Sequence, residues 1–179
     1  MSPEPADWCC IAAVNDRRVL SENLARSPAL AAEPDRLTTV EGAASAGAAY
    51  NEGLARTGAG IDLFAHQDVY LPAGFPERLS RAVAALGAAD PGWAVAGVFG
   101  RSTEGGYAGR VWSSGLGREL GSPPDAPVPA QSLDELLIVL RRSSGLAFDP
   151  RVPGFHLFGT DIVQTALRRG FGAYVLDLP

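Results

Sequence analysis

The sequence predicts an α/β protein in which helices cover both faces of a mostly parallel central sheet. Short, continuous apolar runs recur along the chain, as expected for strands that are buried on both faces. Segments with the helical spacing of apolar residues lie between these runs. Polar residues follow several runs, at the strand ends where open α/β sheets usually bind ligands. Alternation of this kind favours a layered sandwich over a bundle or an all-β fold.

The expected strands are the apolar runs themselves. The first, Trp8–Val14 (WCCIAAV), ends in the polar pair Asn15-Asp16, and the third, Ile61–Ala65, ends in His66-Gln67-Asp68. The remaining runs are Leu37–Val40, Trp93–Phe99, Leu136–Leu140 and Ala173–Leu176.

The expected helices fill the intervals between strands. A first helix ends before Pro28, and a second spans Ala44–Arg56 with small residues on its inner face, which permit close packing against a sheet. A third spans Phe75–Leu86 and is capped by Gly87. A fourth spans Thr160–Arg169, with a hydroxyl at its start and arginines in its last turn.

We expect one domain over residues 1–179, with a flexible N-terminus at residues 1–7. Residues 100–130 are rich in Gly, Ser and Pro, which predicts a loop or lid with a hairpin around Tyr107 to Ser113.

Composition excludes several classes of protein. The 179 residues carry a net charge of −5, and no Lys/Arg cluster is longer than a pair, so nucleic acid and anionic membranes are poor partners. Adjacent Cys9 and Cys10 form neither a disulfide framework nor a zinc ribbon. The sequence has no signal-peptide pattern and no apolar run of transmembrane length. We therefore expect a soluble, cytoplasmic protein.

Three common motifs are absent from the sequence: GxxxxGK[ST], GxGxxG after the first strand, and GxSxG. P-loop, Rossmann dinucleotide and α/β-hydrolase sites therefore have no support. The polar residues that could bind a ligand lie instead at the expected strand ends: Asn15-Asp16, Glu41, 66–68 and 155–161.

Two segments carry a resemblance to a known family. Ala44–Pro72 contains the alanine-rich string around Asn51 and then HQDVYLP, and residues 154–162 read GFHLFGTDI. Together they resemble family-2-type glycosyltransferases with the GT-A fold, specifically a bacterial branch related to the StrF proteins. In this resemblance His66-Gln67-Asp68 stands where many relatives have Asp-x-Asp.

The resemblance implies a GT-A-like three-layer sandwich and a metal-dependent glycosyltransferase. Such an enzyme moves a sugar from a UDP- or GDP-sugar to an acceptor that the sequence does not identify. Asp161 takes the place of the catalytic base, and Asp68 with His156 would hold Mn²⁺ or Mg²⁺. The nucleotide-binding residues would be Asn15, Glu41, Tyr50, Asn51, His66 and Gln67.

The chemistry of these residue types fits that function. A leaving nucleoside diphosphate develops negative charge, which a divalent ion held by carboxylate and imidazole ligands neutralises. An inverting transfer needs a base for the acceptor hydroxyl. Asp161 stands at the amino end of a helix, where the helix dipole favours a charged carboxylate.

Ordinary structural roles remain open for the same residues. Asp68 suits a turn, His156 a core position, Asp161 a helix first turn, and Asn51 a bond to a neighbouring backbone carbonyl. The Asp134-Glu135 pair suits a solvated strand entrance, although relatives place an acidic pair near the acceptor.

Two departures from the family pattern bear on catalysis. Relatives commonly have H-x-Tyr-Asp-x-Asp, whereas Phe158, Gly159 and Thr160 precede Asp161 here, so one carboxylate is missing. Relatives continue past the last strand to a further histidine, and this sequence ends at Pro179. The alternative is a non-catalytic nucleotide-sugar or sugar-binding protein with the same fold. A sugar nucleotidyltransferase would need a basic, glycine-containing loop after the first strand, which 15–18 does not supply.

Overall fold

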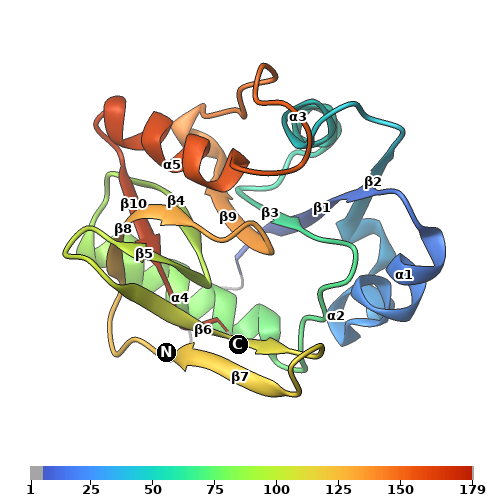
Figure 1. The fold of residues 1–179 in the computed structure, drawn as a ribbon, viewed down its shortest axis with the longest axis horizontal. Coiled ribbons are helices and arrows are strands. Elements are labelled where there is room, and N and C mark those ends of the chain that lie inside the picture. The colour runs from blue at the N-terminus through green and yellow to red at the C-terminus, as the bar shows by residue number, and fades with distance from the viewer. Residues whose placement is uncertain (1–5, 179) are drawn as a thin grey trace.

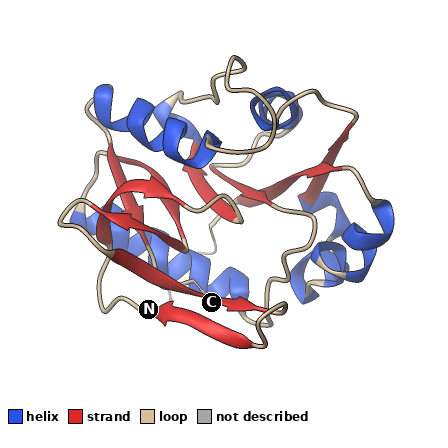
Figure 2. Ribbon diagram, in the orientation of Figure 1, coloured by secondary structure: helices blue, strands red, loops and turns tan. Residues whose placement is uncertain are grey.

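A computed structural model describes residues 6–178, which form a mixed α/β fold around one ten-stranded sheet (Figures 1 and 2). The strand order is β2-β1-β3-β9-β4-β10-β8-β5-β6-β7. The strands are β1 (Trp8–Val14), β2 (Leu37–Glu41), β3 (Ile61–Ala65), β4 (Trp93–Gly97), β5 (Phe99–Ser102), β6 (Tyr107–Ser113), β7 (Arg118–Ser122), β8 (Val128–Leu133), β9 (Leu137–Arg141) and β10 (Gly172–Val175). The helices are α1 (Arg17–Glu22), α2 (Pro28–Ala32), α3 (Ala46–Arg56), α4 (Phe75–Ala89) and α5 (Phe158–Arg168), with short 3-10 turns at Leu24–Arg26 (η1), Pro34–Arg36 (η2) and Arg142–Ser144 (η3).

The prediction of a mostly parallel sheet is wrong. Only β1 with β2, β1 with β3, and β10 with β4 pair in parallel, and the other six pairings are antiparallel. The decisive strand is β9, which lies between β3 and β4 and runs against both. It begins at Leu137, beside Ala65 at the end of β3, so it can only run back toward the start of that strand.

The two faces of the sheet bury separate apolar clusters. In β1 the side chains of Trp8, Cys10, Ala12 and Val14 join the cluster that includes α4, as the two-residue period of a strand requires. Ile11 joins the other cluster, with α3 and α5. Figure 1 accordingly shows α3 and α5 on one side of the sheet and α1, α2 and α4 on the other. The three layers are those that the sequence predicts.

Helix α3 lies close to the sheet because Ala46, Gly47, Ala49 and Gly53 form most of its buried face. The inner face expected from the sequence (44, 47, 48, 51 and 55) is wrong except at Gly47, because the buried side of the helix is turned relative to it and also includes Tyr50. A Cβ at Gly53 would collide with the Ile11 side chain of β1. A Cβ at Gly47 would lie 2.7 Å from the backbone oxygen of Asp149 in the loop before α5. Larger residues at either position would push α3 away from β1 or from that loop.

Helix ends differ from the prediction at two places. Helix α4 continues through Gly87 to Ala89, and its C-cap is Asp90, whose N–H donates to the Leu86 carbonyl. Helix α5 begins at Phe158, with Leu157 rather than a hydroxyl residue at its N-cap.

The segment 100–130, where the sequence predicts a loop or lid, contributes residues to β5, β6, β7 and β8. The hairpin expected around Tyr107–Ser113 is β6 paired with β7. Its Val111 packs against the cluster that also holds Phe75 and Leu79 of α4. The hairpin is therefore anchored to the sheet. Of the N-terminus expected to be flexible, residues 1–5 lie outside the described part of the chain.

A buried polar cluster ties α3 to the sheet. Asp62 of β3 is fully buried, and its Oδ1 accepts hydrogen bonds from Arg142 (2.8 Å), Thr57 (2.9 Å) and the Cys9 thiol (3.0 Å). Arg142 also donates to the Leu54 carbonyl near the C-terminal end of α3 and to the hydroxyl of Thr57. One guanidinium thus compensates a buried carboxylate and a helix end together.

Burial makes both cysteine thiols poor nucleophiles. Burial, reinforced by the hydrogen bond to Asp62, raises the pKa of Cys9 from 9.0 to about 12, and burial raises the pKa of Cys10 as well. Because the thiolate is the reactive form, we expect the native protein to react with a disulfide reagent at pH 8 at least about a hundredfold more slowly than the urea-unfolded chain.

The same shift predicts a loss of stability at high pH. Between pH 9 and 12 the Cys9 thiol ionises in the unfolded chain but not in the folded one, so stability falls across this window. Urea unfolding from pH 7 to 11 measures it. The variant Cys9→Ala should show a flatter decline, and identical slopes in both proteins would contradict the prediction.

Among residues 6–178, none of the helices is long and apolar enough to cross a membrane.

Candidate functional site

Three of the predicted nucleotide-binding residues meet where β1, β2 and β3 end. The Gln67 side-chain oxygen accepts from the backbone N–H of Asn15 (3.0 Å) and of Asp16 (3.2 Å), and its amide donates to the Asn15 side chain. Glu41, the register neighbour of Val14, pairs with Arg17 at 2.9 Å. The parallel pairing of these strands brings together residues that are far apart in the sequence.

His66 and Asp68 follow β3 and line a cavity of about 640 Å³. The cavity lies between the segment 66–75, the β6–β7 hairpin and the turn before β9. The backbone N–H of His66 donates to the Leu136 carbonyl (3.0 Å), which fixes the start of this segment against β9. Within the described chain the side chains of His66 and Asp68 make no hydrogen bond or ion pair, so they are available to a ligand.

The first turn of α5 lies next to His66. The ring of Phe158 is 6.3 Å from the His66 ring, and Glu135 accepts a hydrogen bond from the Gly159 N–H (3.3 Å). Gly159 is required at this contact, because a Cβ there would lie 2.5 Å from the Leu133 carbonyl oxygen. Leu157 has φ of 67°, the left-handed region that non-glycine residues rarely adopt. Such strain is common at ligand sites.

Asp161 is half-buried in the first turn of α5, as the sequence predicts. In the neighbouring loop, Arg151 pairs with Asp149 at 2.7 Å. This hydrogen bond lowers the pKa of Asp149 to about 2. Asp149 and, more weakly, the Asp161 carboxylate raise the pKa of Arg151. His156 lies on the same loop and is exposed to solvent.

Two of the predicted nucleotide-binding residues have structural roles. Tyr50 is only 2% exposed and packs against the rings of Phe64, Phe148 and Phe158, so its side chain is not accessible to a nucleotide. The Asn51 amide donates to the Phe148 carbonyl (2.8 Å) and its oxygen accepts from the Phe148 N–H (2.9 Å). Asn51 thus holds the loop before α5 against α3, which is the backbone-binding alternative left open for it.

The described residues do not bring a complete set of metal ligands close together. Among residues 6–178, no group of three or more His, Cys, Asp or Glu side chains lies close enough to hold a metal. Asp68 offers an unengaged, exposed carboxylate and His66 or His156 an imidazole, which are donor types that suit Mn²⁺.

Sequence reasoning missed several residues of this region. Glu135 belongs to an acidic pair that the sequence allowed to be a solvated strand entrance, yet it binds the first turn of α5. No sequence motif includes Arg151. Tyr70 and Trp112 line the cavity and are 53% and 68% exposed. In the string YAGRVWS, Trp112 lies on the same side of the strand as Arg110. An aromatic residue on this polar side could have identified Trp112 as a ligand contact.

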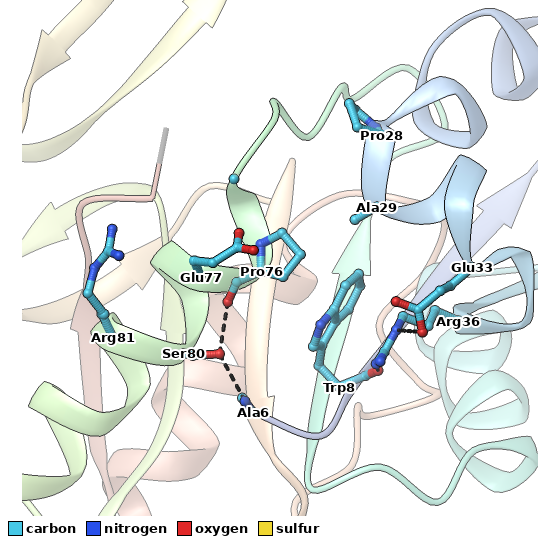
Figure 3. A pocket seen from close by; sticks show the side chains of 11 residues that line it. Ala6, Trp8, Pro28, Ala29, Glu33, Arg36, Pro76, Glu77, Ser80 and Arg81 are labelled. Atoms are coloured by element: carbon cyan, nitrogen blue, oxygen red, sulfur yellow. Dashed lines mark hydrogen bonds and ion pairs between the residues drawn. The ribbon is translucent and has the colours of Figure 1, made fainter. Parts of the chain in front are cut away.

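A second cavity, of about 600 Å³, lies between α2 and α4 near the start of β1 (Figure 3). Trp8 and Arg36 line it together, and Arg36 lies over the Trp8 ring and donates to Glu33 at 2.9 Å. Ser80 accepts from the Ala6 N–H at 2.9 Å. The residues lining this cavity include none of the predicted site residues, which follow the other ends of the strands.

Comparisons with known proteins bear on the fold. No family model matches the chain. The chain is 32% identical over 124 residues to "ATP synthase subunits region ORF 6" of Fuscovulum blasticum, a match that takes in 64% of this chain and 48% of that protein. The chain thus spans about half the length of the curated relative that it matches.

A solved structure resembles nearly the whole chain. The mannosyltransferase PcManGT from Pyrobaculum calidifontis, in complex with GDP-Man and Mn²⁺, matches 99% of this chain and 57% of its own, with a TM-score of 0.57 and 17% identity. The fold of this chain is thus similar to that of a glycosyltransferase, as the sequence resemblance implied.

Proposed function

We propose that the protein is a metal-dependent glycosyltransferase that uses a nucleoside-diphosphate sugar, within the StrF-related branch that the motifs around His66 and His156 resemble. The observation that carries the proposal is a fold shared over 99% of the chain with an enzyme solved with GDP-Man and Mn²⁺. The polar residues at the ends of β1, β2 and β3 support it, because open α/β sheets bind ligands at such ends.

In this proposal different residues bind the nucleotide, hold the cation and take up the proton. Asn15, Glu41 and Gln67 would bind the nucleotide, together with His66. Asp68 and His156 would hold a divalent cation, which supplies positive charge to the departing diphosphate.

Asp161 accepts the proton of the acceptor hydroxyl. The hydroxyl oxygen forms a bond to the anomeric carbon, the bond from that carbon to the phosphate oxygen breaks, and the nucleoside diphosphate leaves with the electron pair.

Calorimetric titration with UDP and GDP, each with and without Mn²⁺, tests the proposal. We expect one nucleotide to bind, and to bind more tightly with the metal. If neither nucleotide binds in saturating Mn²⁺, the proposed donor class is wrong. Release of nucleoside diphosphate from UDP-glucose or GDP-mannose above background would reject the alternative of a non-catalytic binding protein.

The variant Asp68→Asn should weaken metal-dependent nucleotide binding by about tenfold or more, which is at least about 1.4 kcal/mol. The amide keeps the size of the side chain but removes the charge that pairs with the cation. Because Asp68 is exposed, the melting temperature without metal should stay the same or rise.

Asp35→Asn, which changes an exposed carboxylate in η2, is the matched control and should bind nucleotide as the unmodified protein does. Equal affinity of Asp68→Asn and the unmodified protein at saturating Mn²⁺ would exclude a metal role for Asp68.

A further inference from the structure

The walls of the cavity beside His66 and Asp68 are mostly apolar. Buried apolar side chains from the segment after β3, from the end of β4 and from the start of β9 form much of its lining: Leu71, Phe75, Val98 and Leu137. Val111 and Leu120, opposite each other in the β6–β7 hairpin, add to it.

Several polar side chains that line the cavity are already engaged within the protein. The Asn23 amide donates to the Val19 carbonyl at 2.9 Å. Arg110 is paired with Glu119 (3.3 Å) and Asp177 (2.9 Å). The side chains of Tyr70, Trp112 and Ser114 have no partner in the described chain, but the apolar walls offer none to the hydroxyl groups of a polyhydroxylated ligand, and each unpaired group would cost binding free energy.

The side chains of His66 and Asp68 are also unengaged in the described chain, and these two residues belong to the candidate transfer site as well. The cavity therefore adjoins the site, and its walls away from His66 and Asp68 are mostly apolar. Its volume of about 640 Å³ lies in the range of small-molecule sites and exceeds that of one sugar ring.

We infer that this cavity receives the acceptor, and that the acceptor is an amphiphilic alcohol. Its apolar chain lies between the β6–β7 hairpin and the segment 66–75, and its hydroxyl lies toward His66 and Asp68. Exposed Trp112 and Tyr70 cover the part of the chain that reaches solvent. The inference rests on the proposed transfer function, because only then is the bound alcohol an acceptor. The binding of the alcohol itself needs no donor sugar and can be measured alone.

A pair of ligands with one headgroup and different tails tests the inference. Octyl β-glucoside, kept below the concentration at which it forms micelles, should bind at least about tenfold more tightly than methyl β-glucoside, because only its tail buries apolar surface. Of the three tryptophans, Trp8 and Trp93 are buried and Trp112 is exposed, so protection of fluorescence from acrylamide reports on the cavity.

Two leucines of the hairpin provide matched variants. Leu120→Asp places a charge in the cavity and should abolish octyl glucoside binding. Leu116→Asp makes the same change in the turn between β6 and β7, where Leu116 is 62% exposed and outside the lining, and should leave binding unchanged. Val69→Asn alters the opposite wall and should weaken binding even if Leu120→Asp disturbs the hairpin.

Each outcome decides the inference. Equal affinity for the two glucosides, no binding of octyl glucoside, or equal losses in Leu116→Asp and Leu120→Asp would overturn it. If octyl glucoside binds as expected but neither UDP nor GDP does, the cavity stands as an amphiphile site and the proposed transfer function fails. If a nucleotide binds but the octyl tail does not change the affinity for the glucoside, the inference about the cavity fails and the proposed transfer function stands.

Discussion

Replacing Arg142 with methionine should lower the free energy of unfolding by about 3–5 kcal/mol, the range measured when one partner of a buried ion pair is removed. Methionine keeps the aliphatic stem but leaves Asp62 as a fully buried, uncompensated carboxylate. The variant also removes the donors to the Leu54 carbonyl at the end of α3. Urea unfolding followed by circular dichroism measures the loss.

Two further variants show whether the buried charge is the cause. The double variant Asp62→Leu with Arg142→Met should recover much of the stability, because an apolar pair can replace a buried ion pair. Arg168→Met, which removes an exposed arginine bonded to Thr165, should change stability by less than about 0.5 kcal/mol. A loss below about 1 kcal/mol in Arg142→Met would contradict the role assigned to this cluster.

Replacing Asp161 with asparagine should slow release of nucleoside diphosphate from the donor sugar by about 10² to 10⁴-fold, the usual contribution of a positioned base. Asparagine keeps the size of the side chain but cannot take the proton of the acceptor hydroxyl or of water. Nucleotide affinity should stay within about twofold, because Asp161 is not among the proposed nucleotide ligands.

The control for this variant is Asp125→Asn, in the exposed loop between β7 and β8. It should release nucleoside diphosphate at the unmodified rate. If Asp161→Asn also retains that rate while keeping its melting temperature, Asp161 is an ordinary first-turn residue of α5 and another group acts as base.

The layers of the fold could be predicted from the sequence, but the direction of its strands could not. A strand buried on both faces has a continuous apolar sequence whichever way it runs, so LLIVL at β9 carries no sign of direction. The direction depends on where the chain returns, and here the backbone N–H of Asp134 donates to the carbonyl of Phe99 (2.8 Å), just beyond the end of β4. That contact depends on the strands formed within 100–130, whose Gly- and Ser-rich sequence predicts a loop.

Residue types at strand ends predicted which polar side chains gather at this edge of the sheet. Asn15, Glu41 and Gln67 meet because parallel pairing of β1 with β2 and β3 follows directly from the order of strands and helices. Tyr50 was predicted to bind the nucleotide but is buried, because it lies on the side of α3 that packs against Phe64, Phe148 and Phe158. The sequence of an alanine-rich helix does not show which side of the helix its tyrosine occupies. The contact of Glu135 with α5 joins two distant segments and left no local pattern.

The position of β9 between β3 and β4 has a consequence for synthesis and refolding. Until residues 137–141 are available, β3 keeps one edge of unpaired backbone N–H and C=O groups, and β4 keeps both, because its other neighbour β10 comes still later in the chain. Both strands are fully buried in the native sheet. Exposed apolar edges of this kind pair readily with other chains. The chain is therefore most prone to aggregate while residues 137–175 are still missing or unfolded, and a chaperone that covers these edges would raise its yield.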